Sequence, residues 1–277
     1  MLIDAPFFVR VGRAWCFGVA TMSHECRGDL PSNLTRRVRN GGEICKAAIH
    51  LLILIPVFAG PLRTIENGRA NGVDGLEIIG PERIHELEPQ ASTDAIQALY
   101  CPHTGIVDPF EVAIAAAENA AANGVEFLFN APVHSIEQSG DSFILRTPEE
   151  DIRARWIVNA AGCYADVISN MAGGEHFEIG WRQGNLLVLD KNATTEAIMP
   201  IYPVPSPTTK GVVVMGTVHG NVLIGSTAVM REKGDLSCYA ADINELMAGA
   251  AKLVPSLDVR SSIRQFAGGR AVITDTN

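Results

Sequence analysis

The sequence lacks the close cysteine and histidine pairs that build metal sites and disulfide frameworks. Its 277 residues include six cysteines, none in a CxxC pair, and seven histidines, none in an HxxxH pair. Structural zinc sites use such close pairs, and small secreted scaffolds carry a far denser cysteine framework. The pattern therefore predicts reduced thiols in a cytoplasmic protein without a metal.

Long apolar runs are also absent. The most apolar segment, residues 49–59, is interrupted by Pro56 and falls short of the roughly 20 residues that span a bilayer. Its length is typical of a buried strand or helix. Arg10 and Arg13 precede a short apolar stretch, but no small-residue cleavage site of a signal peptide follows it. We expect no direct membrane span.

A third absence is the glycine-rich turn that binds phosphates. The chain contains neither a GxGxxG sequence nor a P-loop. In a dinucleotide-binding fold, this turn lets the backbone approach the pyrophosphate at a helix N-terminus. Gly41 and Gly42 precede a possible helix, but no strand comes before them and no third glycine is in register. On this pattern alone, the chain lacks its own diphosphate cradle.

Positive charge is the last shortage. The formal net charge is -9 and the pI is about 5.3, which argues against binding to nucleic-acid phosphates. A local arginine or lysine cluster can still bind a small anion. Hydrophobic residues make up 47% of the chain, so it can form one large domain or two smaller ones.

Regular patterns begin after residue 61, and no element is assigned before it apart from the apolar segment at residues 49–59. Asp108 can cap a helix that has Pro109 in its first turn and Glu111 at the capping-box position. Strands are predicted at residues 100–106, 125–129, 133–137, 142–147, 156–162, 185–189, 211–215, 221–224 and 261–266, and helices at 81–88, 108–124, 164–171 and 241–253. The order predicts an α+β or α/β fold, in which part of a nucleotide-binding layer joins an antiparallel substrate-domain sheet.

Two turns contain candidate site residues. Ala160, Ala161 and Gly162 follow an apolar strand, and such small residues allow either the close approach of a flat ligand or a tight turn into a helix. His219 lies in a second turn, where it could accept a proton or cap a hairpin. The residues alone leave both alternatives open at each turn.

An arginine near the end of the chain is a candidate for anion binding. Arg270 follows Gly268 and Gly269 at a strand end, where its planar guanidinium can bind a carboxylate or a phosphate. The alternative is a surface arginine beside a flexible turn. Arg264 is the nearby competitor for the same role.

Several segments together resemble a known family. Residues 71–79, Glu88-Pro89 and residues 105–109 are similar to FAD-dependent glycerol-3-phosphate dehydrogenases of the anaerobic type, within the D-amino-acid-oxidase-like class. The related L-2-hydroxyglutarate oxidases carry a similar Gly-Ile-Val-Asp segment. Further similar segments are residues 118–125, 156–162, 202–207 and 218–225.

The resemblance implies a flavoenzyme with a partial FAD-binding, Rossmann-like domain and an antiparallel-sheet substrate domain. It implies that Val133 contacts the adenine side of FAD through its backbone, and that residues 160–162 lie along the cofactor. It also implies that Arg270 holds the anionic end of the substrate, while residues 268–269 let the chain approach the flavin ring. Hydride would pass to the flavin, and His219 is the candidate base for the hydroxyl proton.

The resemblance covers residues 62–275 and divides the chain into four parts. Residues 1–61 are an atypical, unassigned region, and residues 62–130 mix elements of both domains. Residues 131–175 carry FAD-domain elements, and residues 176–277 form the substrate-domain sheet running into the flavin-facing end. The family begins with a strand, a glycine-rich turn and a helix, and it ends with a closing strand and a glycine-bearing helix. We therefore expect a chain that is incomplete at both ends and needs a missing segment or a partner subunit.

Three functions fit these expectations. The first is oxidation of a small anionic 2-hydroxy compound, with glycerol 3-phosphate as the leading candidate. The second is a non-catalytic fragment of such an enzyme. The third is a relative that oxidises 2-hydroxyglutarate or an amino acid such as glycine, because Arg270 suits a carboxylate equally well.

Overall fold

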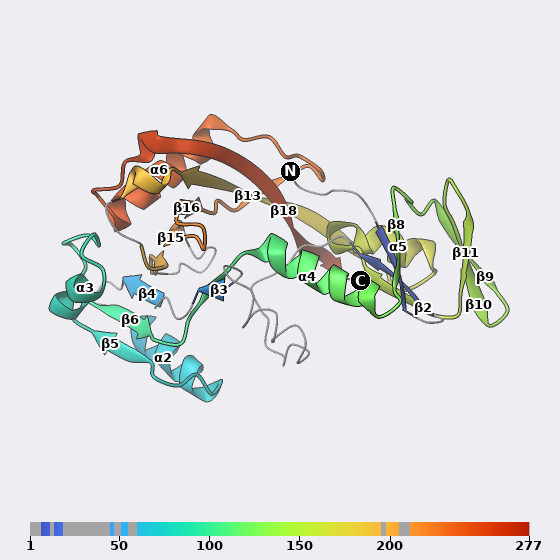
Figure 1. Cartoon of the computed structure of the whole chain (residues 1–277), viewed down its shortest axis with the longest axis horizontal. Coiled ribbons are helices and arrows are strands. Elements are labelled where there is room, and N and C mark those ends of the chain that lie inside the picture. Colours follow the sequence, from blue (N-terminus) through green and yellow to red (C-terminus); the bar gives the residue numbers. More distant parts are fainter. Residues whose placement is uncertain are drawn as a thin grey trace.

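The computed structural model describes residues 7–11, 14–18, 45–46, 51–54, 60–194, 198–204 and 211–276. The molecule is elongated, and its two longest strands run side by side along much of it (Figure 1). These are β13 (Phe177–Leu189) and β18 (Ser262–Thr276). A large sheet lies at one end of this strand pair and smaller sheets lie at the other, so the pair connects the two parts of the fold.

The large sheet has nine strands and is antiparallel in all but one of its pairings. Its order is β17-β13-β16-β15-β14-β4-β6-β5, and β18 pairs with β13. The strands besides β13 and β18 are β4 (Leu51–Leu54), β5 (Glu77–Ile79), β6 (Ala98–Cys101), β14 (Ile201–Tyr202), β15 (Val213–Gly216), β16 (Val222–Gly225) and β17 (Val229–Arg231).

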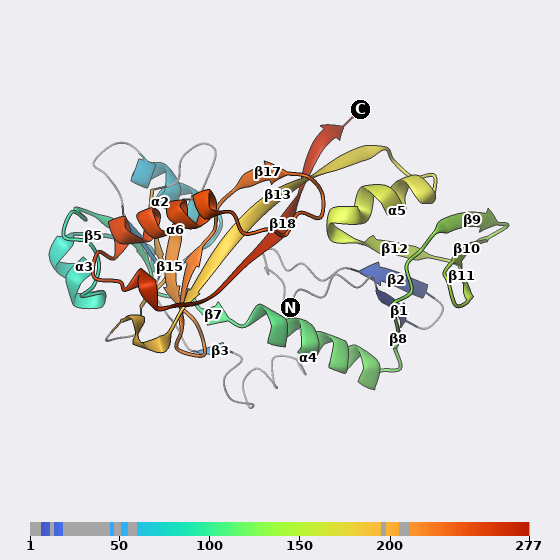
Figure 2. The same ribbon diagram turned by 90° about the horizontal axis from the view of Figure 1, so that it is seen from above.

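One face of this sheet is buried beneath helix α6 (Ala240–Leu253), which lies across it in Figure 2. Leu246, Ala250 and Leu253 recur at helical spacing and are all buried. They pack against the side chains that the strands direct to this face, including Leu187 and Ile224.

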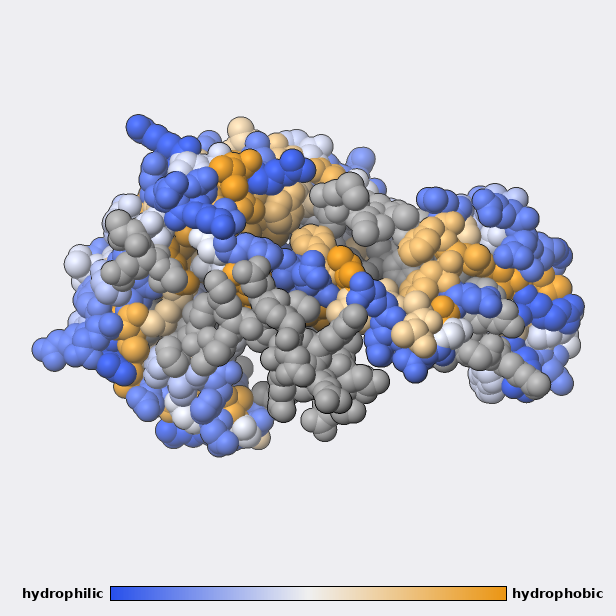
Figure 3. Space-filling view, in the orientation of Figure 1, coloured by the Kyte–Doolittle hydropathy of each residue, from blue (hydrophilic) through white to orange (hydrophobic). Residues whose placement is uncertain are grey.

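The second sheet has the order β12-β2-β1-β8. Its strands are β1 (Phe7–Val11), β2 (Ala14–Gly18), β8 (Glu126–Phe129) and β12 (Ile157–Ala160). Strands β2 and β12 are parallel, and their carboxyl ends pair at Gly18 and Ala160. Apolar surface appears near β8 and α5 in Figure 3, and Phe129 and Trp156 are 62% and 69% exposed.

A three-stranded antiparallel sheet packs beside the second sheet. Its strands are β9 (Ser135–Ser139), β10 (Ser142–Arg146) and β11 (Asp151–Ala154). Leu145 and Ile152 of this sheet share a core with Ile168 of helix α5 (Ala165–Met171). The remaining elements are α2 (Gly60–Ala70), α3 (Pro81–Leu87), α4 (Pro109–Ala122) and the strand pair β3 (Cys45–Lys46) and β7 (Ile106–Val107).

Helix α4 begins as its sequence predicts. The Asp108 side chain accepts hydrogen bonds from the backbone N–H groups of Phe110, at 2.8 Å, and Glu111, at 3.3 Å, which satisfies two otherwise unpaired donors of the first turn. Among the described helices, none combines the length and the apolarity of a membrane span.

The predicted mixed fold class is confirmed, but the sequence left several elements unassigned. In the first 61 residues only the segment at residues 49–59 was expected to be a strand or helix, and β4 lies there; β1, β2 and β3 also lie in this region and pair with strands distant in the sequence. Strand β13 was predicted only from residue 185, yet it begins at Phe177 and contains Gly180 and Gly184, a residue type that weakens strands. The hydrogen-bonded neighbour β18 keeps the strand continuous through both glycines. The four-part domain division remains a prediction.

Candidate functional site

The strand-to-helix turn after β12 is fixed by small residues and one asparagine. Ala161 is completely buried, and Gly162 has φ 55°, a left-handed conformation that favours glycine. The Asn159 side chain accepts from the N–H of Ala161 at 3.3 Å and donates to the carbonyl of Ala165 at 2.8 Å. Ala160, in contrast, is exposed. The turn therefore presents Ala160 beside a rigid backbone corner.

Val133 packs into the same small core as this turn. Its side chain is 8% exposed and belongs to the cluster that contains Ala161 and Ile168. The structure thus brings together two segments that the sequence singled out separately. Contact between the Val133 backbone and the adenine side of FAD stays a prediction.

The turn also contacts the end of β18. The Cys163 thiol, one residue after Gly162, lies 3.5 Å from the carbonyl oxygen of Gly269 and donates to it. Cys163 is buried, so this contact lies inside the protein. It places the turn at residues 160–162 next to the segment at residues 268–270.

The face of the large sheet opposite α6 carries residues of β13 and β18 that range from buried, at Gly184, to exposed, at Arg270. Cross-strand partners share a face, so Arg182 and Arg270, Gly184 and Gly268, and Leu186 and Phe266 lie on it as three successive pairs. We call this surface, defined by these six residues, the open face. It combines a basic pair, a glycine pair and an apolar pair along one stretch of the strands.

Adjacent glycines on β18 have different surroundings. A side chain at Gly268 would meet no atom within 4 Å, whereas one at Gly269 would overlap the ring of Trp181. Trp181 is 4% exposed, and its indole N–H donates to the Asp235 carbonyl at 3.0 Å. Gly268 therefore leaves space on the open face, while Gly269 makes room for the tryptophan on the other face. The expectation that both glycines admit a ring is supported by geometry only for Gly268.

Arg270 is held over the neighbouring strands. One terminal nitrogen of its guanidinium donates to the carbonyl oxygen of Thr227 at 3.0 Å. Partial desolvation by the surrounding protein, and then the positive charge of Arg182, lower the pKa of Arg270 from its usual value. The group remains a cation at any physiological pH. Arg264 lies on the same face but six residues before Arg270 in β18, opposite Val188.

His219 lies elsewhere. It occupies the turn between β15 and β16, and its Nε2 lies 2.9 Å from a carboxylate oxygen of Asp108 at the start of α4. The strand register places this turn beside Leu189, whereas Arg270 is opposite Arg182. Seven residues of strand separate the two positions, roughly 20 Å. The structure does not bring His219 to Arg270. The position of His219 instead matches a link between this turn and α4.

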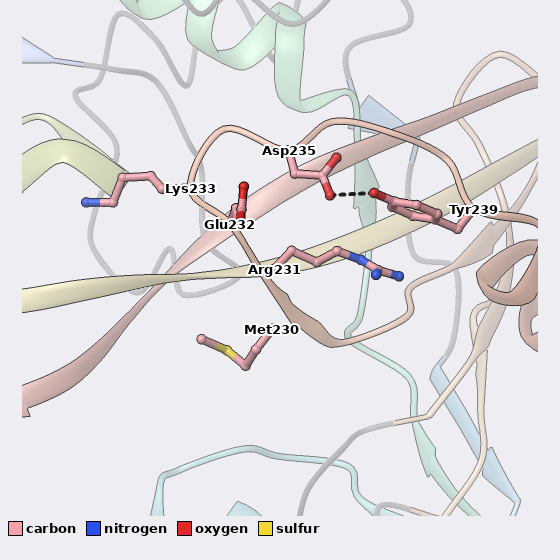
Figure 4. Close-up of a pocket in the computed structure, with 6 residues that line it drawn as sticks. All are labelled: Met230, Arg231, Glu232, Lys233, Asp235 and Tyr239. Carbon is pink, nitrogen blue, oxygen red and sulfur yellow. Dashed lines mark hydrogen bonds between the residues drawn. The ribbon is translucent and has the colours of Figure 1, made fainter.

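A polar pocket of about 500 Å³ lies on the other side of β13 and is lined by Met230, Arg231, Glu232, Lys233, Asp235 and Tyr239 (Figure 4). The Tyr239 hydroxyl donates to Asp235 at 3.0 Å, and the Arg231 guanidinium lies 4.0 Å from the centre of the Tyr239 ring. No sequence motif indicated this pocket. Within the described residues, no cluster of three metal-ligating side chains occurs.

A buried network anchors the pocket loop to the sheet. Arg231 and Asn185 both donate to the Asp242 carboxylate of α6, at 2.9 and 3.0 Å. Lys233 donates to Asp166 of α5 at 2.8 Å. Burial alone would raise the pKa of Asp166, but hydrogen bonds from Lys233 and from backbone N–H groups lower it overall. These contacts tie the large sheet, the loop and the second sheet together.

Comparison with known proteins identifies this architecture. A model of the family described as FAD dependent oxidoreductase matches residues 48–277. The chain belongs to this family. Its members use FAD. The matched range includes β13 and β18, the two strands that carry the open face.

Individual relatives of this FAD dependent oxidoreductase chain match it over part of their own length. A glycerol 3-phosphate dehydrogenase of Caloramator mitchellensis is 37% identical over 207 residues, which cover 74% of this chain and 43% of that protein. The mitochondrial L-2-hydroxyglutarate dehydrogenase of Bos taurus is 31% identical over 210 residues, covering 68% of this chain and 45% of that protein. The chain spans about half the length of the curated relatives it matches.

The fold matches solved structures of the family. The L-alpha-glycerophosphate oxidase of Mycoplasma pneumoniae, solved in a dithionite-reduced form with FAD bound, superposes with a TM-score of 0.75 at 23% identity. The match covers 88% of this chain and 67% of that one. This likeness establishes the fold.

The described residues fit part of an FAD molecule. Gly268 leaves open space for a flat ring, and the carboxyl ends of β2 and β12 meet at one sheet edge, where α/β folds bind dinucleotides. The diphosphate is the part without a matching motif, because the sequence has no GxGxxG.

Two features of the site were missed by the sequence reasoning. Arg182 and Gly184 lie on the open face, but the segment around them was not predicted as strand. The segment carries no local strand signal, because the buried residues Gln183 and Asn185 are polar and no apolar residue alternates with Arg182 and Gly184.

Proposed function

We propose that this chain contributes the flavin-facing and substrate-holding surface of an FAD-dependent oxidoreductase that oxidises a small 2-hydroxy compound. Glycerol 3-phosphate is the leading substrate. The observation that carries the proposal is the Cys163–Gly269 contact of 3.5 Å, because it joins the strand-end turn of the nucleotide layer to the strand that bears Gly268 and Arg270.

Each part of this surface has a physical task in the proposed reaction. FAD supplies the hydride acceptor. Arg270 binds the anionic end of the substrate and so fixes which carbon approaches the ring. Gly268 leaves room for the ring to approach the backbone. Leu186 and Phe266 exclude water beside it, which strengthens the arginine's electrostatic pull.

The first test is the visible absorption spectrum of the purified chain before and after addition of FAD. A flavin spectrum that survives desalting supports the proposal. Anaerobic bleaching by glycerol 3-phosphate, compared with 2-hydroxyglutarate and glycine, then ranks the substrates. A chain that retains FAD but is bleached only by glycine would overturn the 2-hydroxy substrate class.

A second candidate function is a non-catalytic fragment that needs another chain. The lack of a GxGxxG sequence favours it, since that turn binds the diphosphate in dinucleotide-binding folds. A colourless chain that acquires FAD only when mixed with a polypeptide carrying the glycine-rich turn would support this alternative. Bleaching of FAD on the chain alone would exclude it.

A further inference from the structure

Arg182 is a second cation at the position where the proposed substrate binds. The register of β13 and β18 pairs it directly with Arg270, so both side chains leave the same face of adjacent strands. Side chains in this relation have Cβ atoms about 5 Å apart. Like charges that are directly opposed repel each other across a sheet, and an anion bound between them offsets this repulsion.

The Arg270 side chain crosses β13 to reach its partner. Thr227 lies on the far side of β13 from β18, in the segment between β16 and β17, and its carbonyl accepts from Arg270 at 3.0 Å. The crossing passes Gly184, where an added side chain would lie 3.2 Å from the same carbonyl. The missing side chain at Gly184 thus allows the guanidinium of Arg270 to lie over the strand that carries Arg182.

We propose that Arg182 and Arg270 form a two-arginine clamp for a doubly charged phosphate monoester, and that Arg182 determines the preference for this group over a single carboxylate. The inference rests on the proposed function. A carboxylate carries one charge and is satisfied by one guanidinium fork. A phosphate monoester has close to two charges and three acceptor oxygens, which suit two cations on adjacent strands. The overall charge of -9 makes this local basic pair more notable.

The test measures equilibrium binding, so it does not need turnover. Isothermal titration calorimetry at about pH 8 keeps the phosphate close to doubly charged, because its second pKa is about 6. Glycerol 3-phosphate is titrated into the full chain, and glycolate serves as a single-carboxylate ligand. Arg182→Gln should weaken glycerol 3-phosphate binding at least about tenfold, the typical worth of a hydrogen bond to a charged group, and change glycolate binding less than about threefold.

The chain offers a matched control on the same face. Arg264→Gln removes the same charge from β18 at a point roughly 20 Å from Arg270, and it should leave both affinities within about twofold. Arg182→Lys keeps the charge and should recover part of the lost affinity, which a purely structural role of Arg182 does not predict. Circular dichroism of each variant checks that the sheet is intact.

A phosphate can also belong to the cofactor, so ADP forms a third arm. The inference is overturned if Arg182→Gln weakens ADP but not glycerol 3-phosphate, if it weakens glycolate as much as glycerol 3-phosphate, or if the wild-type chain binds no glycerol 3-phosphate at millimolar concentration. The flavin spectrum separates this outcome from failure of the proposed function. If glycerol 3-phosphate bleaches the Arg182→Gln variant as well as the wild-type chain, the proposed function stands and the clamp is refuted.

Discussion

Gly268 and Gly269 are neighbours on β18, yet the same substitution should have opposite effects at the two positions. An alanine methyl at Gly269 would overlap the buried Trp181 ring. Overpacking of a core typically costs about 1–3 kcal/mol. Displacement of the ring would also break the 3.0 Å bond from the Trp181 indole to Asp235, worth about 1 kcal/mol. We expect Gly269→Ala to destabilise folding by about 2–4 kcal/mol in total.

Gly268→Ala should behave differently. Its methyl would meet no atom within 4 Å, and alanine is favoured over glycine inside a strand by about 0.5–1 kcal/mol. The free energy of unfolding should therefore stay equal or rise slightly. The same methyl projects into the space we assign to the flavin ring, so the affinity for FAD should fall.

Urea unfolding followed by tryptophan fluorescence measures the first effect, and titration with FAD measures the second. In thermal unfolding, each kcal/mol corresponds to about 2–4 °C for a chain of this size class. Equal destabilisation by both substitutions would show that the assignment of the two faces is wrong. Unchanged FAD binding in Gly268→Ala, with a folded protein, would remove Gly268 from the flavin surface.

Four other substitutions test the contacts that hold the site in place. Asp166→Asn should cost about 2 kcal/mol, since it removes the charge that accepts from Lys233. Because the Asp166 pKa is lowered on folding, the stabilisation from Asp166 is present above its ordinary pKa and is lost as the pH falls through the lowered pKa. Urea denaturation of the wild-type protein at several acidic pH values measures this loss. A free energy of unfolding that does not change over these pH values would contradict the prediction. Asp108→Ala should cost about 1 kcal/mol as a lost helix cap. His219→Ala should cost less and leave turnover unchanged; a large fall in kcat for His219→Ala would restore its candidacy as a base. Gly162→Ala should destabilise by about 1 kcal/mol, because φ is 55° there, and a neutral result in urea unfolding would contradict the rigid turn.

Local signals explain what the sequence predicted. The start of α4 was assigned correctly from Asp108, Pro109 and Glu111, because capping depends on residues within one turn. The helix α6 was also predicted within a residue or so, from a single apolar stripe. The resemblance located the turn at residues 160–162 and Arg270, both of which the structure places at the junction of the two sheets.

What the sequence did not reveal depends on distant partners. Arg182 becomes notable only when the register of β18 places Arg270 opposite it. The role of Gly269 is visible only beside Trp181, 88 positions earlier in the sequence. Strands β1 and β2 pair with β8 and β12 across more than 100 residues, and their own sequence shows no clean alternation. His219 was placed near the chemistry because a turn histidine has no local feature that indicates its direction.

The continuous pairing of β13 with β18 has a mechanical consequence. Thirteen residues of β13 run from the region of α6 to that of α5, and β18 pairs with them along this length, with register shifts at Glu178/Ile179 and Val188/Leu189. The same neighbour strand carries Arg270 and the Gly269 carbonyl that contacts the strand-end turn. No hinge between the two regions can open without breaking this ladder of backbone hydrogen bonds. We therefore expect the two regions to move together as one body rather than to swing apart.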